Sequence, residues 1–347
     1  MLTSTPARIA GYVGRKVAGT ILTVLVLAVA VFILIQITPG DEAVAAAGPG
    51  ATAEQIEQQR EQLGLSGSLP QRLVSFIGSL ATGNLGISSA SHGPVTDVIA
   101  AAVPVTTELV VVSVILSVLV AVPLAALSAI RASGRGEELR RFLIVLVCGL
   151  PTFWLAMMLQ WVLGAKLGWF PISGRYTIGA TSVPTITGST LFDAMLVGDW
   201  SAMGDALAHI ALPATVLSLG FIGPAYRILR TEFITAAHRD FVTVARAAGH
   251  GRFQLLRRHI VPHVMTPLLI LVGIEFGSLF GGAVLVESVF ARDGLGAMLT
   301  NAVAQKDSTV VIGGVLVIGI IVVVVNLLVD VVQTLRDPRL RSAEMGV

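Results

Sequence analysis

The stretch STVVIGGVLVIGIIVVVVNLLV, residues 308–329, decides the fold class of this chain. It contains no charged residue, and a helix needs about 20 mostly apolar residues to cross a bilayer. Similar charge-free stretches lie at 17–40, 109–130, 142–165 and 206–226, and a further apolar stretch at about 264–289 is interrupted by Glu275. The sequence therefore predicts an all-α integral membrane protein with six transmembrane helices, at about 17–37, 107–130, 142–166, 207–229, 264–289 and 309–333.

The composition excludes several classes of protein. Of the 347 residues, 54% are hydrophobic and 13% are charged, whereas a soluble domain has about 45–50% and about 25%. Disordered chains, charged tails and ordinary soluble enzymes are therefore excluded. The single cysteine, Cys148, allows no intrachain disulfide. None of the three lysines stands between the glycine and the Ser or Thr that a phosphate-binding loop requires. We expect no catalytic residues, no metal site and no cofactor in this chain.

The positive charges predict the orientation. Of the 23 Lys and Arg residues, 17 lie in the N-terminus, in 131–141, in 227–262 and in the C-terminal tail. Cytoplasmic loops carry the excess of Lys and Arg, so both termini are expected in the cytoplasm. The first span also fits a signal peptide, but its apolar core exceeds the roughly 7–15 residues of such a segment. We expect a cytoplasmic N-terminus at 1–16, one membrane domain at 17–341 and a tail at 342–347.

Two segments are expected outside. In the first, at 38–104, Thr52 and Gln55 predict a capped helix over 52–63, and the apolar spacing of 70–80 predicts an amphipathic helix. That helix either lies on the membrane surface or packs on the ends of the spans. The second segment, at 167–208, contains Asp193, Asp199 and Asp205 and reads either as a solvated loop or as a contact for a soluble partner.

The cytoplasmic segment 230–262 predicts a compact knob. Residues 240–248 have helix-forming composition, Gly249 is placed to end that helix, and Pro262 closes a second short helix. Small side chains, including Ala245 and Ala248, would let a partner surface approach. The segment fits either a helix laid into a partner's groove or a basic loop on anionic lipid headgroups.

Polar and small residues mark the last two spans. A charge inside a bilayer costs at least about 2.5–3.5 kcal/mol, so Glu275 is expected to line a polar path or to pair at a helix interface. Asn326 is a second candidate for the path. Gly273, Gly277 and Gly281 are spaced by four residues, which permits close helix packing, either within this chain or against a second membrane subunit.

A series of short motifs resembles one known family. The motifs are TPGD (38–41), LGLS (63–66), GNLG (83–86), LPTFW (150–154), GWFPISG (168–174), GGAV (281–284), ESVF (287–290), GLG (294–296) and DPR (337–339). In this order they are similar to the B-type permease subunit of dipeptide and oligopeptide importers of the ATP-binding-cassette class. The resemblance covers about 17–341.

The resemblance carries further implications. The family's coupling helix has the pattern E-A-A-x3-G-x9-I-x-L-P, of which Ala245, Gly249 and Pro262 match while Thr243, Val244, His259 and Val261 depart. The resemblance implies a type I importer fold in the bacterial plasma (inner) membrane, with di- or oligopeptides as cargo. The residues expected at the ATPase contact are Asp240, Ala245, Arg246, Ala248, Gly249 and Pro262.

The implied partners are a second homologous permease subunit, two ATP-binding subunits that hold ATP and Mg, and an extracytoplasmic substrate-binding protein. Two alternatives remain open from the residues themselves. One is an ion- or proton-coupled secondary transporter that uses Glu275 as the carrier. The other is a structural scaffold without a transport path.

Overall fold

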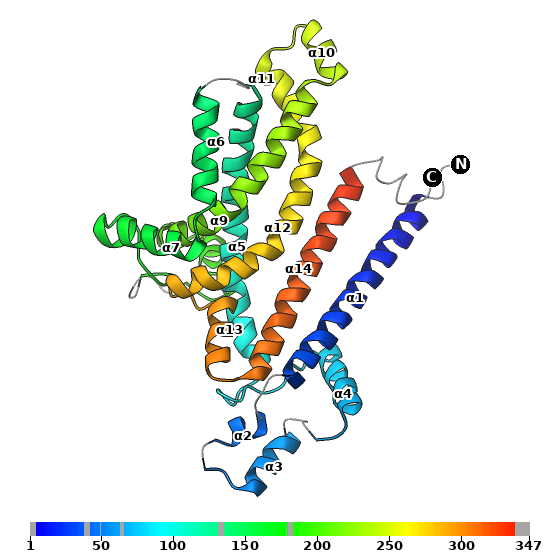
Figure 1. Cartoon of the computed structure of the whole chain (residues 1–347), viewed down its shortest axis with the longest axis vertical. Coiled ribbons are helices and arrows are strands. Elements are labelled where there is room, and N and C mark those ends of the chain that lie inside the picture. The colour runs from blue at the N-terminus through cyan, green and yellow to red at the C-terminus, as the bar shows by residue number, and fades with distance from the viewer. Residues whose placement is uncertain are drawn as a thin grey trace. The chain divides into compact units, whose positions relative to one another are not determined.

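The computed structural model describes residues 5–37, 42–48, 50–62, 66–130, 135–177, 179 and 183–336. Regular structure in these residues is helical, apart from one isolated antiparallel bridge between Ile87 and Pro94. The chain divides into two compact units, one of Met1–Thr106 and Arg292–Leu327, the other of Thr107–Ala291 and Leu328–Val347. Figure 1 labels the helices of both units.

Five helices within the described residues are long and apolar enough to cross a membrane. They are α1 (Thr5–Ile37), α5 (Val95–Ile130), α9 (Trp200–Ala237), α12 (Val261–Val289) and α14 (Ser308–Arg336). The all-α prediction is confirmed, and so is the presence of a long apolar helix at five of the six predicted positions.

The third predicted span, 142–166, is wrong as one continuous helix. α6 (Arg135–Cys148) ends before Pro151, and α7 (Thr152–Leu159) begins after it and continues into the π-helical segment η1 (Gln160–Lys166). Proline has no N–H and disfavours a helical conformation in the residue before it. A crossing here requires both pieces, so the six-span, N-in and C-in topology stays a prediction.

Several helices are longer than the apolar stretches predicted. α5 begins at Val95, inside the segment that was expected to be external up to residue 104, and α1 begins at Thr5 rather than at 17. α9 begins at Trp200 and ends at Ala237, eight residues into the segment expected to start at 230. Helices can project beyond the bilayer, so the loss of apolar character marks the membrane boundary and not the end of the helix.

In the first unit α4 packs on α1, α13 packs on α14, and α2 and α3 pack on each other. It contains α2 (Glu42–Ala47), α3 (Ala53–Gln62), α4 (Leu69–Ala81) and α13 (Leu295–Ala304) besides parts of the long helices. Gly319 of α14 lies against Leu27 of α1, leaving no room for a Cβ. The TPGD and DPR motifs, residues 63–65 and the tail at 342–347 lie outside the described residues.

Both helices predicted in the first external segment are present. α3 begins with the expected capping box, in which the Thr52 N–H donates to Gln55 Oε1 at 2.9 Å and the Gln55 N–H donates to Thr52 Oγ1 at 3.3 Å. α4 packs on α1, because the rings of Phe76 and Phe32 lie 5.6 Å apart. No residue of α4 is buried, however, so the choice between a helix on the membrane surface and a helix packed on the spans stays open.

The second unit is built around α9. Its other elements are most of α5, α6, α7, η1, α8 (Thr190–Val197), α10 (Asp240–Ala247), α11 (Arg252–Leu255), the π-helical segment η2 (Leu256–Ile260) and α12. α9 packs against α6, α7, α8 and α12. Two hydrogen bonds join it to α5: the Ser117 hydroxyl donates to the Ser218 carbonyl at 3.2 Å, and Ser128 and Tyr226 share a bond of 2.8 Å.

Candidate functional site

The knob consists of α10, the turn at Gly249, α11 and η2, and it leads directly into α12. Figure 1 shows α10 and α11 at the end of the second unit, beyond α9 and α12. Gly249 has a φ of +87°, its N–H donates to the Arg246 carbonyl at 3.0 Å, and the His250 N–H donates to the Ala245 carbonyl at 3.2 Å. The helix over 240–248 and its end at Gly249 are confirmed.

Gly249 is needed for its backbone conformation and not for space. A Cβ placed on this residue would meet no atom within 4 Å. A positive φ, however, brings the Cβ of an ordinary residue too close to the following carbonyl oxygen, whereas glycine adopts it freely.

The knob has a packed inside, and two apolar side chains are exposed on its outside. Val242, Ala245 and Leu255 are buried, whereas Val244 and Phe253 are 68% and 74% exposed. The small size of Ala245 therefore serves packing within the knob, which corrects the expectation that it opens the surface to a partner. The other predicted coupling residues, Asp240, Arg246, Ala248, Gly249 and Pro262, are exposed.

Aromatic contacts tie the knob to the first turn of α12. The rings of Phe241 in α10 and His263 in α12 are stacked with centroids 4.6 Å apart. The rings of His250 and His259 lie 5.2 Å apart. The first contact joins α10 to α12, and the second lies within the knob, between the turn and η2. Sequence reasoning missed both the stack and the outward-facing Val244, because neither depends on a spacing within one helix.

The predicted path residues lie in different units. Glu275 is half-buried on α12 of the second unit and makes no hydrogen bond or ion pair within the described part of the chain. Asn326 is exposed on α14 of the first unit. Their shared role in a path stays a prediction.

The glycine row on α12 changes from buried to open along the helix. Gly273 is buried and Gly277 is partly buried, whereas a Cβ on Gly281 would meet no atom within 4 Å. The adjacent Gly282 faces α9, where a Cβ would lie 2.9 Å from Leu217 Cδ1. The close helix contact within this chain thus uses Gly282, and Gly281 is free to meet another surface.

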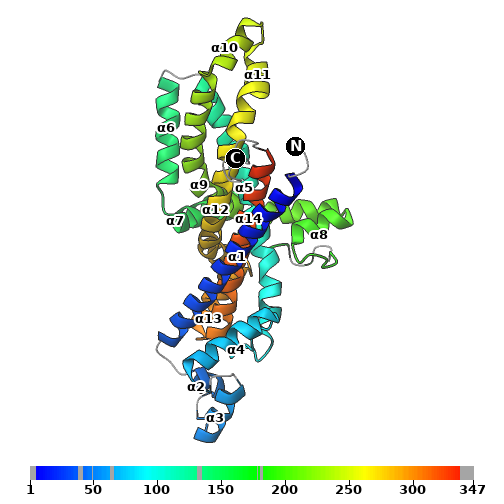
Figure 2. The same ribbon diagram turned by 90° about the vertical axis from the view of Figure 1, so that its right-hand side faces the viewer.

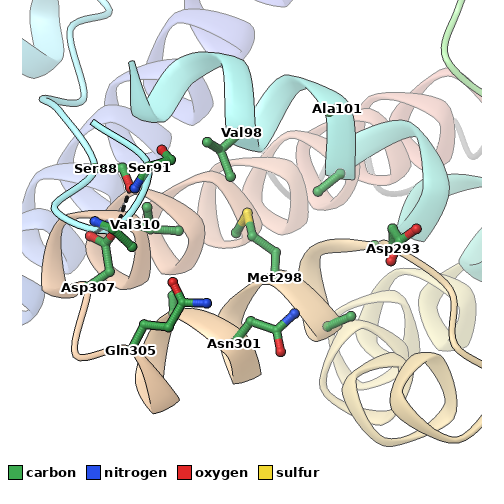
Figure 3. A pocket seen from close by; sticks show the side chains of 15 residues that line it. Ser88, Ser91, Val98, Ala101, Asp293, Met298, Asn301, Gln305, Asp307 and Val310 are labelled. Carbon is green, nitrogen blue, oxygen red and sulfur yellow. Dashed lines mark hydrogen bonds between the residues drawn. The ribbon is translucent and has the colours of Figure 1, made fainter. Parts of the chain in front are cut away.

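The first unit contains a cavity of about 410 Å³ between the segment 88–102, α13 and the start of α14 (Figure 3). The buried Asp307 carboxylate accepts the hydroxyl hydrogen of Ser88 at 2.5 Å and the N–H groups of Ala90 and Val310, each at 3.2 Å. These bonds hold the cavity wall together. Among the described residues, no group of three or more His, Cys, Asp or Glu side chains is placed to hold a metal ion.

Comparison with known proteins places these features in a family. Residues 121–342 match the model for the binding-protein-dependent transport system inner membrane component, and residues 9–110 match the N-terminal model of the same transport systems. The chain is 30% identical to the dipeptide transport system permease protein DppB of Escherichia coli K12, over 95% of this chain and 98% of that protein. It is 28% identical to the protein of the same name in Alkalihalophilus pseudofirmus, over 95% and 99% of the two chains. A putative peptide permease protein of Brucella ovis is 32% identical, over 91% and 94%.

Proposed function

Since the chain belongs to the family of binding-protein-dependent transport system inner membrane components, we propose that it moves di- or oligopeptides into the cytoplasm. It is the permease subunit of an ATP-binding-cassette importer, a multi-pass inner membrane component, and not an enzyme. A transport system of this kind works with an ATPase and with a binding protein.

Peptide cargo is supported by the relatives. All the relatives compared above are named as dipeptide or peptide permeases, and they align with more than nine-tenths of this chain at 28–32% identity. The complex comprises this chain, a second homologous permease, two ATP-binding subunits that hold ATP and Mg, and the binding protein. Cargo selection then rests on the binding protein as well as on the path.

The knob docks into a groove of an ATPase subunit. The observation that carries this is the exposure of two apolar side chains, Val244 and Phe253, on a helix–turn–helix. Burial of a Val or Phe side chain contributes about 1.5–3 kcal/mol, which favours a protein groove over the charged headgroups of a lipid surface. The exposed Arg246 and Asp240 then lie at the rim of the contact.

Alternating access follows from this docking. ATP binding draws the two ATPase subunits together, the knob moves with its subunit, and the Phe241–His263 stack passes the motion to α12 and from there to α9. Moving a two-state equilibrium from 1:99 to 99:1 requires about 5.5 kcal/mol of differential binding. Repeated ATP binding and hydrolysis supplies this bias. A lone carboxyl group such as Glu275 is a weaker candidate, which disfavours the ion-coupled alternative.

The test pairs two matched substitutions in the tagged, co-expressed complex. Val244→Asp is expected to abolish co-purification of the ATPase chains and ATP-dependent uptake of labelled dipeptides into proteoliposomes. The control, Val303→Asp on α13, places the same charge on a side chain that is 63% exposed and is expected to retain both. Full ATPase recovery and uptake with Val244→Asp would refute the docking. Uptake that collapses with an uncoupler but survives ATP depletion would favour the ion-coupled transporter.

A further inference from the structure

The short helix α8, which the sequence did not predict, carries an apolar surface on the side of the second unit. Its exposed side chains, with those of the residues next to it, form the α8 patch: Ile186, Phe192, Met195, Leu196, Val197 and Trp200. They are between 38% and 71% exposed, and Trp200 is the most exposed of them. Exposed apolar side chains concentrated on one short helix and the residues next to it mark a contact with a partner or with a membrane.

The patch is held in a fixed orientation from beneath. Leu191, Asp193 and Ala194, on the other side of α8, are buried. The Ser189 hydroxyl caps the helix, accepting the Phe192 N–H at 3.3 Å, and donates to the carboxylate of the buried Glu108 on α5 at 2.5 Å. α8 therefore cannot turn its apolar face inward without breaking buried hydrogen bonds.

The acidic residues near the patch accept hydrogen bonds from this chain's own N–H and hydroxyl groups. The Asp193 carboxylate accepts the N–H groups of Ile186, Thr187 and Gly188 at 2.7–3.2 Å and also the Thr187 hydroxyl. Asp199 caps α9 by accepting the Ala202 N–H at 3.0 Å, and Asp205 accepts the N–H and hydroxyl of Thr177. No Lys or Arg occurs between residues 176 and 208. The acids that suggested a soluble partner thus hold the loop together, and the patch itself presents no charge.

We propose that the α8 patch lies in the outer interface of the lipid bilayer. Trp200 is the first residue of α9, which runs on as a membrane span, and Trp is enriched where a span leaves the membrane. Figure 2 shows α8 turned across the direction of α6 of the same unit, as in a helix that lies in the interfacial plane with its apolar side in lipid. The absence of charge on the patch argues against a binding protein that must dissociate in every cycle.

The test measures which medium surrounds Trp200 in the assembled complex. Trp154, Trp161 and Trp169 are replaced by Phe, and the complex is placed in nanodiscs of lipids brominated at carbons 6 and 7 or at carbons 11 and 12. The Trp200 signal is the difference between this complex and the same complex that also carries Trp200→Phe, which removes the contribution of the partner subunits. We expect the shallow bromines to quench Trp200 on the order of twofold and the deep bromines to quench it less, as for an interfacial tryptophan.

Three results would overturn the proposal. Quenching by aqueous iodide without quenching by bromolipid would place the patch in water. Iodide quenching that disappears when the binding protein is added would assign it to that partner, and insensitivity to both quenchers would assign it to a second protein subunit. If the Trp substitutions impair assembly, Leu196→Cys in a Cys148→Ala background carries a bimane label for the same comparison. Glu57→Cys on α3 serves as the water-exposed control.

Discussion

Replacing Gly249 by alanine isolates the conformational requirement of the knob. The residue has a φ of +87°, and its Cβ position is open, so the change introduces backbone strain without a clash. An ordinary residue in a left-handed conformation costs about 1–2 kcal/mol, which corresponds to roughly a 5–30-fold change in a two-state ratio. Strain of this size acts on the bonds of Gly249 and His250 that end α10. We therefore expect the ratio of correctly folded to distorted knob to fall by a comparable factor.

The assay is ATP hydrolysis stimulated by loaded binding protein, together with peptide uptake, in proteoliposomes. Gly249→Ala should lower both several-fold, and Gly249→Asn should retain more activity because Asn tolerates positive φ. Gly251→Ala is the matched control, since that glycine lies two residues away, also has an open Cβ position and has no positive φ. Equal activity of the two alanine variants would refute the reasoning, as would an Asn variant no better than Ala.

Three further predictions follow from neighbouring features. Gly282→Val should destabilise the complex by about 1–3 kcal/mol through overpacking against Leu217, which a lower temperature of thermal aggregation would show. Gly281→Val should leave stability unchanged but lower the amount of the second permease that co-purifies. Unchanged co-purification with Gly281→Val would show that the glycine row does not lie in the subunit interface. Burial raises the pKa of Asp193, but the hydrogen bonds from Thr187 and its neighbours outweigh burial and bring the pKa below its usual value. The stabilisation by these bonds is present above the unfolded pKa of about 3.9 and is lost as pH falls through the folded pKa. Hydrogen exchange of the 186–188 amides, corrected for intrinsic rates, should therefore accelerate in acid for the wild type but show no such transition in Asp193→Asn. Glu275→Gln should keep ATP-dependent uptake that is insensitive to an uncoupler, and loss of uptake with intact ATPase activity would assign the carboxyl group a direct role in the path.

Most long helices could be predicted because hydropathy is a local property. α1 and α14 lie at charge-free stretches, and their composition alone identifies them as helices that can span a membrane. The third stretch, 142–165, is also free of charge, but Pro151 divides it. A hydropathy count does not register a single proline, although the backbone rule that breaks the helix is also readable from the sequence.

The site was only partly predictable for a different reason. The end of α10 at Gly249 follows from local backbone chemistry. The stack of Phe241 on His263 joins two separate helices, and the Asp193 carboxylate is bonded by the irregular loop at 186–188, so neither follows from the spacing within one helix. α8 itself has readable ends, with Ser189 before it and Gly198 after it, but the surrounding Gly, Pro, Ser and Thr residues obscured them.

The π-helical segment η2 is the last element of the knob and continues directly into α12. In such a segment one extra residue is accommodated within a helical turn. Each residue of an α-helix turns the chain by about 100° and advances it by about 1.5 Å. Deleting one residue from 256–260 would let the π turn relax to an α turn and rotate α10 by about that angle around α12. The length of η2 therefore determines the direction in which α10, with its exposed Val244, faces relative to α12.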